Sequence, residues 1–201
     1  MIELRWADGA GVEAHVAAQL AHPGSKTIAL PGGATPGPIL RALAARPDIV
    51  WESVTILPTD ERDVPATHAA SNLGMLRNIF GTTGARLLPL REGMAVPPLD
   101  LAWLGMGLDG HVASLFPNLA PATDAAVGVI AVTPDPLPPE APYARLSLAM
   151  ATLAASTETI LVIRGEAKRR IVEDAVHHGD LPVARLLRVA HGPLTVFWSE
   201  T

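Results

Sequence analysis

The sequence predicts an α/β fold with three layers, α/β/α, built on a mostly parallel, Rossmann-like sheet in a single domain of residues 1–201. Short apolar segments alternate along the chain with segments of helical spacing, which is typical of a parallel sheet covered on both faces. A length of 201 residues suits one α/β domain. The one linker-like stretch, Pro134–Pro142, is too short to separate two domains.

Seven short apolar segments, bounded by polar or turn residues, are expected to be strands. They are Ile2–Trp6, Lys26–Leu30, Val54–Leu57, Leu99–Leu104, Val127–Val132, Thr159–Ile163 and Leu194–Trp198. Helical spacing of apolar residues, such as Val12, Val16 and Leu20, predicts helices between them. The expected helices are Gly11–Ala21, Pro38–Ala45, Ser71–Phe80 and Glu166–His177.

Composition narrows the class of protein. Hydrophobic residues make up 49% of the chain, but no apolar run approaches the ~20 residues needed to cross a membrane. The opening residues lack the basic-then-apolar order of a signal peptide, so we expect a cytoplasmic protein. Without cysteine, disulfides, thiolate nucleophiles and cysteine metal sites are excluded. A net charge of −5 gives no reason to expect nucleic acid as a partner.

A glycine-rich turn, G-M-G-L-D-G-H-V-A-S-L-F-P at Gly105–Pro117, follows the predicted strand Leu99–Leu104. Ligands bind at this edge of open parallel sheets. Asp109 and His111 supply a proton acceptor and a group to orient it. The alternative is a connection in which His111 only makes local hydrogen bonds, because short glycine motifs are weak signals. Ser114 lacks the G-x-S-x-G context of a serine nucleophile and is interpreted as a turn residue.

A second glycine loop, P-G-G-A-T-P, joins a predicted strand to the helix that begins near Pro38. The backbone N–H groups of Gly32, Gly33 and Ala34 are then open to an anion at the positive end of that helix. The loop has neither a P-loop lysine nor a G-x-G-x-x-G pattern, so it favours one small phosphate over a nucleotide. A tight turn without a ligand is the alternative.

Charged residues follow the predicted strand Val54–Leu57. Asp60, Glu61 and Arg62 directly abut this apolar strand, and Ser71 with Asn72 begins the next helix. Such positions face a cleft in an α/β sheet. A solvated charged loop is the alternative, because runs of charge are usually exposed.

Two further groups of side chains have competing interpretations. Lys168 opens a helix beside Arg169 and Arg170, either as an anion contact or as part of a solvated basic patch. His68 and His111 are conceivable metal ligands. They lack the spaced ligand set of a metal site, so we expect neither a metal nor a cofactor.

The three motifs together resemble the 6-phosphogluconolactonase family, within the glucosamine-6-phosphate isomerase/6-phosphogluconolactonase superfamily. The matching segments, which follow the family's order from about Lys26 to Trp198, are G-G-A-T-P at Gly32–Pro36, D-E-R-D-V-P-A-T-H-A-A-S-N at Asp60–Asn72, the turn at Gly105–Pro117, R-L-S-L at Arg145–Leu148 and G-E-A-K at Gly165–Lys168. Family members usually have Thr where Val112 stands, Ser or Arg where Ala34 stands, and Lys where Leu137 stands. A side-chain contact to phosphate is therefore expected to be missing.

The resemblance implies hydrolysis of 6-phospho-D-glucono-1,5-lactone to 6-phosphogluconate, in the oxidative pentose phosphate pathway. His111 would activate water, Asp109 or Asp60 would orient the His111 imidazole, and Arg62 would stabilise the carbonyl oxygen. The residues that the resemblance assigns to phosphate are Gly32, Gly33, Ala34, Thr35, Arg145 and Lys168. The expected partner is thus a small sugar-phosphate lactone, with no nucleic acid or membrane, and the chain is expected to be a monomer or small homo-oligomer.

Two other functions remain open. Glucosamine-6-phosphate deaminases share the phosphate loop and the D-G-H turn, but have Tyr where Arg62 stands and Asn-Glu-Pro where this chain has Leu115–Pro117. Val112–Pro117 contains no carboxylate for the extra proton transfers that such an enzyme needs. A non-catalytic sugar-phosphate sensor would keep the phosphate loop but would not need Asp109 and His111.

Overall fold

The computed structural model describes residues 4–119, 126–137 and 141–200. Its main strands are β1 (Leu4–Asp8), β2 (Lys26–Leu30), β3 (Val54–Pro58), β5 (Arg86–Leu87), β6 (Leu101–Leu104), β9 (Glu158–Arg164) and β10 (Leu194–Ser199). Its α-helices are α1 (Val12–Leu20), α2 (Gly37–Ala44), α3 (Asn72–Phe80), α4 (Met150–Ala154), α5 (Glu166–His177) and α6 (Pro182–Val189). Short 3-10 turns lie at Gly9–Gly11, Trp51–Ser53 and Pro117–Leu119.

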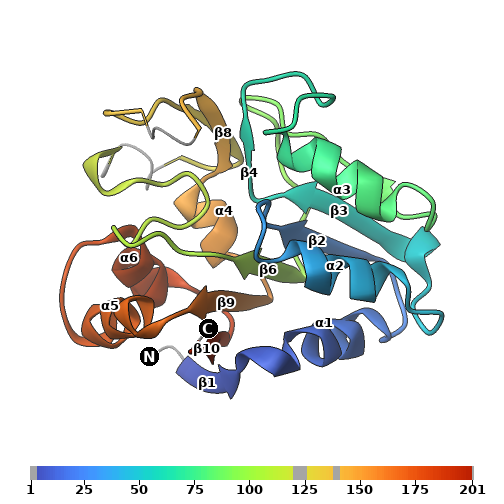
Figure 1. Cartoon of the computed structure of the whole chain (residues 1–201), viewed down its shortest axis with the longest axis horizontal. Coiled ribbons are helices and arrows are strands. Elements are labelled where there is room, and N and C mark those ends of the chain that lie inside the picture. The colour runs from blue at the N-terminus through green and yellow to red at the C-terminus, as the bar shows by residue number, and fades with distance from the viewer. Residues whose placement is uncertain (1–3, 120–125, 138–140, 201) are drawn as a thin grey trace.

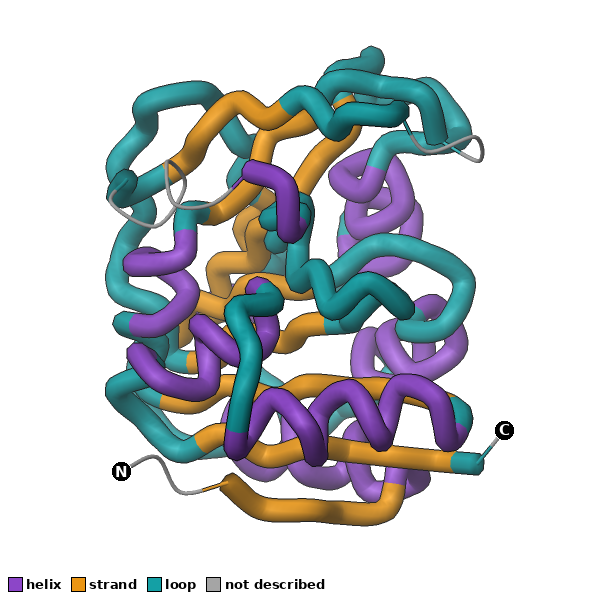
Figure 2. Tube along the Cα trace, turned by 90° about the vertical axis from the view of Figure 1, so that its left-hand side faces the viewer, coloured by secondary structure: helices purple, strands orange, loops and turns teal. Residues whose placement is uncertain are grey.

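Within the described residues, seven strands form one sheet in the order β1-β10-β9-β6-β2-β3-β5, and every pair in it is parallel. Figure 1 shows α1, α2 and α3 to the right and α4, α5 and α6 to the left, and Figure 2 shows the strands between helices. The predicted three-layer α/β fold with a mostly parallel sheet is confirmed.

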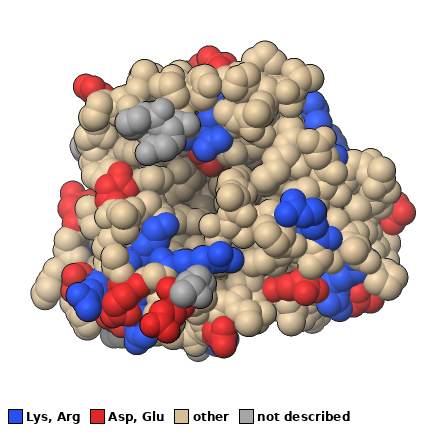
Figure 3. All heavy atoms as spheres, in the orientation of Figure 1, with Lys and Arg blue, Asp and Glu red and all other residues tan. Residues whose placement is uncertain are grey.

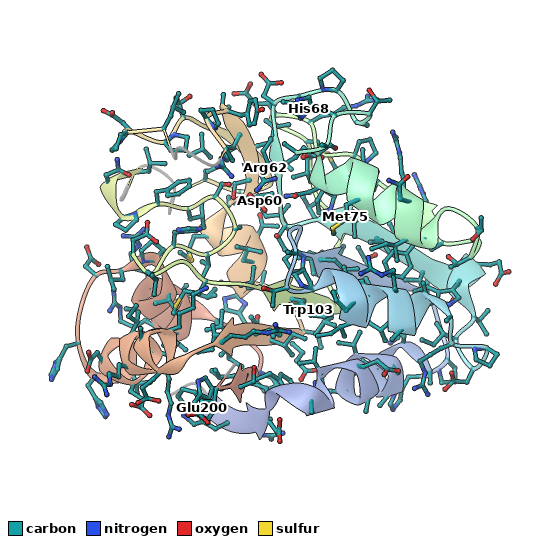
Figure 4. All side chains as sticks on the ribbon, in the orientation of Figure 1. Asp60, Arg62, His68, Met75, Trp103 and Glu200 are labelled. Atoms are coloured by element: carbon teal, nitrogen blue, oxygen red, sulfur yellow. The ribbon has the colours of Figure 1, made fainter. Side chains whose placement is uncertain are left out.

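Successive residues of the central strands contribute side chains to the two hydrophobic clusters on opposite sides of the sheet. Ile28 packs with α1, α2 and α3, whereas the next residue, Ala29, packs with α4, α5 and α6. In the same way, Trp103 packs on the side of α1, α2 and α3, and Leu104 packs on the side of α4, α5 and α6. Successive strand side chains point to opposite faces, so a strand covered on both sides is apolar throughout. Trp103, labelled in Figure 4, is almost fully buried on the α1 side of the sheet.

Most predicted elements agree with the structure to within two residues. β2 and α5 have the predicted bounds, and β6 is shorter than predicted because it begins at Leu101. The first strand ends two residues later than predicted, at Asp8, and the predicted residues 2 and 3 lie outside the described part of the chain. None of the described helices is long and apolar enough to span a membrane.

The predicted strand Val127–Val132 does not belong to the main parallel sheet, where an alternation of strands and helices along the chain would place it. It is observed as β7 (Val129–Val132), in a small antiparallel sheet with β8 (Arg145–Leu148) and β4 (Asp60–Arg62). Figure 1 shows β4 and β8 above the main sheet. The small sheet brings Asp60 opposite Ser147 and Arg62 opposite Arg145.

The chain reverses its direction of winding between β2 and β6. From β2 it passes by α2 to β3 on one side, whereas β6 lies on the other side and leads on to β9. The loops that follow β2 and β6 therefore separate at the carboxyl edge of the sheet. A crevice at such a point is the usual ligand site of an open α/β sheet.

Candidate active site

Two adjoining cavities form one cleft at this edge. The glycine-loop cavity, of about 170 Å³, is lined by Pro31–Pro36, Trp103, Gly105, Met106, Val162, Arg164 and Lys168. The histidine cavity, of about 330 Å³, is lined by Pro31, Gly32, Thr59, Asp60, Arg62, Asn72, Gly105–Gly107, His111, Ala113, Arg145 and Lys168. Both share Gly32, Gly105 and Lys168. In Figure 3 a hollow opens on this face, with Lys and Arg side chains on opposite sides of it.

His111 and Asp109 form a hydrogen-bonded pair on the turn after β6. His111 Nδ1 lies 2.6 Å from Asp109 Oδ1, and the same oxygen accepts the backbone N–H of His111 at 3.2 Å. The side chain of His111 remains 31% exposed, and its ring rests on Phe116 with 4.7 Å between ring centroids. Of the two carboxylates considered for orienting His111, Asp109 is the one that contacts it.

Glycine makes this pair possible. A Cβ on Gly107 would lie 2.3 Å from His111 Nδ1 and 2.5 Å from Asp109 Oδ1. Gly110 has a φ of +76°, which favours glycine. The Gly107 N–H donates to the His111 carbonyl at 3.0 Å and closes the turn. A side chain at position 107 would fill the space that the His111 and Asp109 side chains occupy, so the observed pair requires glycine there.

Asp60 lies deeper, in a buried polar cluster. Its Oδ2 accepts the Ser114 hydroxyl at 2.5 Å, and its Oδ1 accepts Asn72 Nδ2 at 3.3 Å. Arg145 Nη1 is 3.9 Å from Asp60 Oδ2. Ser114, interpreted from the sequence as a turn residue, does lie in a turn, but its fully buried hydroxyl also links that turn to β4. The sequence carries no local signal for this long-range contact.

Two arginines line the histidine cavity. Arg62 donates from Nη1 to the Ala70 carbonyl at 2.7 Å, and Arg145 donates from Nη2 to the Ala141 carbonyl at 3.1 Å. The Nε atom of each is buried without a hydrogen-bond partner among the described residues. Burial lowers the pKa of Arg145; the Arg62 charge lowers it further, while Asp60 opposes the shift. Arg145, grouped with phosphate in the sequence analysis, lines the histidine cavity instead of the glycine-loop cavity.

Glu61 holds this region together. Its carboxylate accepts the backbone N–H groups of Arg62, Asn72 and Leu73 at 2.7 to 2.8 Å and the Ser71 hydroxyl at 2.9 Å. A carboxylate suits the first turn of α3 because the N–H groups there lack helical partners. The sequence favours a cleft position for Glu61; in the structure its carboxylate anchors β4 to α3.

The glycine loop leads directly into α2. Gly33 has a φ of +100°, which the loop needs in order to turn. Gly32 packs against the Asn72 side chain so closely that a Cβ would lie 1.8 Å from Asn72 Oδ1. Asn72 Nδ2 donates to the Asp60 carbonyl at 2.7 Å, so one buried amide touches both halves of the cleft. The sequence analysis expects Asn72 to face a cleft, and the structure places it in the lining of the histidine cavity.

Two cations from β9 and α5 complete the glycine-loop cavity. Lys168, from the first turn of α5, lines both cavities. Burial lowers the pKa of Lys168, and the Asp109 carboxylate opposes that shift. Arg164, the last residue of β9, was missed by the sequence analysis. Its signal was available, since it is a cation directly after a predicted apolar strand.

His68 lies apart from this cleft. It lines a separate cavity with Ser71, Met75 and Arg77, and its ring faces Tyr143 at 5.6 Å between centroids. Figure 4 shows His68 at the periphery of the molecule, farther out than Asp60 and Arg62. Among the described residues, no group of three or more His, Asp and Glu side chains is arranged to hold a metal ion.

Comparisons with known proteins agree on one family. The chain is 35% identical over 223 residues to the 6-phosphogluconolactonase of Pseudomonas aeruginosa, covering 94% of this chain and 89% of that protein. It is 34% identical to that of Pseudomonas putida, covering 90% and 82%. The crystal structure of a 6-phosphogluconolactonase from Shewanella baltica superposes with a TM-score of 0.84 at 25% identity, covering 99% and 98% of the two chains.

The family profile described as glucosamine-6-phosphate isomerases/6-phosphogluconolactonase matches residues 7–198, which include every part of the cleft. On this match and on the identities above, the chain belongs to the glucosamine-6-phosphate isomerase/6-phosphogluconolactonase family.

Proposed function

We propose that this protein is a 6-phosphogluconolactonase, a lactone hydrolase that converts 6-phospho-D-glucono-1,5-lactone to 6-phospho-D-gluconate. The observation that carries the proposal is the His111–Asp109 pair, at 2.6 Å, in the same cleft as the glycine loop and Lys168. The relatives named above are 6-phosphogluconolactonases. The cleft thus offers a proton acceptor at one end and anion-binding groups at the other.

In the proposed mechanism His111 acts through Nε2. Asp109 accepts the Nδ1 proton, so Nε2 is the nitrogen with a free electron pair. Nε2 removes a proton from a water molecule as the water oxygen attacks the lactone carbonyl carbon. The tetrahedral intermediate then collapses, the bond from C1 to the ring oxygen breaks, and Nε2 returns the proton to that oxygen. Acid-base catalysis of this kind needs one positioned imidazole.

We assign the two arginines of the histidine cavity to the reacting end of the substrate, where the lactone carbonyl oxygen gains negative charge. Arg62 carries a permanent cation, and we propose that it stabilises the carbonyl oxygen in the transition state. Arg145 lies beside Asp60 in the same cavity, so we assign it to this half of the substrate rather than to the phosphate. Asp60 then positions Arg145 and the turn that carries Ser114.

The phosphate group is assigned to the glycine-loop cavity. Backbone N–H groups of Gly32, Gly33, Ala34 and Thr35 at the beginning of α2 suit an anion, and Lys168 adds a charge. Binding energy at this distant group holds the lactone ring in position for attack. The described residues of one chain supply both cavities, which supports an active monomer or small homo-oligomer.

Two parallel assays test the function. The first follows hydrolysis of enzymatically generated 6-phosphogluconolactone against its spontaneous background, with plain gluconolactone for comparison. The second follows ammonia release from glucosamine 6-phosphate. We expect hydrolysis well above background, a strong preference for the phosphorylated lactone and no ammonia. Ammonia release without lactone hydrolysis would assign the cleft to a deaminase, and binding without either reaction would indicate a sensor.

A further inference from the structure

We propose that Arg164 is the second cation of the phosphate site and supplies the charge that the glycine loop of this chain does not provide. The assignment rests on the proposed function, which places a phosphate in the glycine-loop cavity. It adds a substrate-binding residue to that site.

The position of Arg164 fits this role. As the last residue of β9 it lies at the carboxyl edge of the sheet, where the chain turns through Gly165, with a φ of +84°, into α5. It lines the glycine-loop cavity together with Lys168, which follows one helical turn later. Strand end and helix start thereby bring two cations to the same small cavity.

Arg164 differs from Arg169 and Arg170 in having no carboxylate partner among the described residues. Arg169 pairs with Glu173 at 2.9 Å, and Arg170 pairs with Glu166 at 3.4 Å on the same helix. No described carboxylate forms an ion pair with Arg164. A cation that lines a cavity and has no described carboxylate partner is available to an anionic ligand.

The glycine loop and Lys168 alone supply less positive charge than a phosphate monoester carries negative charge. A phosphate monoester carries close to −2 at neutral pH, and the loop side chain at position 34 is only a methyl group. Lys168 contributes one cation, which is partly buried and lies near the negative charge of Asp109. Arg164 brings the cationic charge to two. Its planar guanidinium can also donate two parallel hydrogen bonds to phosphate oxygens.

Arg164 also lines a neighbouring cavity of about 430 Å³, together with Gly9, Glu13 and residues of α2. The glycine-loop cavity and this neighbouring space therefore both adjoin Arg164. A terminal phosphate monoester, with three non-bridging oxygens that accept hydrogen bonds, suits a cavity lined by two cations.

Three variants test the proposal: Arg164→Ala, Arg164→Lys and the control Arg170→Ala, whose side chain is 73% exposed and lines neither cavity. Calorimetry measures the Kd of 6-phosphogluconate and of inorganic phosphate, and steady-state kinetics measures KM and kcat. Loss of one charge-assisted contact weakens binding about tenfold to hundredfold. We expect that loss in Kd and KM for Arg164→Ala, a smaller loss for Arg164→Lys, and little change in kcat or in the control.

The results separate this proposal from the proposed function. Wild-type affinity for both phosphate ligands in Arg164→Ala would overturn the role of Arg164, even if the enzyme is an active lactonase. Equal weakening in Arg164→Ala and Arg170→Ala would also overturn it, because general electrostatics would then suffice. Absence of lactone hydrolysis in the wild-type protein would refute the proposed function, while the phosphate Kd values would still decide the role of Arg164.

Discussion

The imidazole of His111 is fixed at one nitrogen only. Asp109 accepts from Nδ1, whereas no described residue hydrogen-bonds Nε2. The second nitrogen is therefore left for a substrate water. A carboxylate in this position also stabilises the imidazolium that forms when the proton arrives. In the proposed mechanism His111 is therefore the residue on which turnover depends most directly.

Replacement of His111 by Ala is expected to lower kcat by ~100-fold or more with a modest change in KM, because general-base catalysis contributes at least that much. Background-corrected lactone hydrolysis measures the effect. His68→Ala is the matched control, since that imidazole lines a different cavity. Wild-type turnover in His111→Ala would eliminate His111 as the base.

Lys168 gives phosphate binding a pH dependence. Burial lowers its pKa below the ordinary lysine value. The ammonium therefore loses its proton at a lower pH than an exposed lysine, and phosphate binding weakens as the pH rises through that lowered pKa. Calorimetry with 6-phosphogluconate between about pH 7 and 10, below and up to the ordinary lysine value, measures this. In Lys168→Arg the affinity is expected to stay flat, and the same decline there would assign the effect to another group.

At the scale of elements, the turn after β6 depends on the absence of a side chain at position 107. Gly107→Ala is expected to displace the His111 ring, because the new methyl would lie 2.3 Å from Nδ1. Kcat should fall by more than tenfold with little loss of Tm, since a misplaced catalytic group is costly. Gly11→Ala is the control, where an added Cβ meets only the Phe197 ring at 3.5 Å. Equal activity in the two variants would show that the turn accommodates a side chain.

Local signals predicted some elements and missed others. Continuous apolar runs gave β2 and β3 because strands buried on both faces need no polar residues. Helix α6 was missed although Pro182 begins it and Val183, Leu186 and Leu187 form an apolar stripe. The two residues of β5 are too few to show any period. A strand as short as β5 depends on its tertiary contacts for its existence, so the sequence around it carries no signal.

At the scale of the whole molecule, the sequence predicted which segments contribute to the cleft. It did not predict which side chains line the histidine cavity and which line the glycine-loop cavity. Strand ends in a parallel sheet meet at one edge, so the motifs after β2, β3 and β6 could be placed together. The place of β4 in the small antiparallel sheet could not be predicted, because its pairing with β8 joins residues more than 80 positions apart. That pairing puts Arg145 beside Asp60, away from the glycine-loop cavity.

In the proposed mechanism, the two arginines near Asp60 affect the end of the reaction as well as its start. Hydrolysis of the lactone creates a carboxylate, so the product leaves carrying one more negative charge than the substrate. Arg62 and Arg145 line the cavity in which that carboxylate forms, and the Nε atoms of both are buried without described partners. The product is therefore held by groups that the neutral ester engages only weakly.

This asymmetry predicts product inhibition whose strength depends on ionic strength. A contact between cation and carboxylate is worth roughly 1.5 to 3 kcal/mol, so 6-phosphogluconate should bind about tenfold or more tightly than the lactone. Added salt should weaken the product more than the substrate and speed its departure, because the cleft opens to solvent. Progress curves with added 6-phosphogluconate at two salt concentrations measure both effects, and equal affinities at both would contradict them. Accumulated 6-phosphogluconate would then occupy the cleft in place of the lactone and slow hydrolysis, while the chemical step still sets kcat.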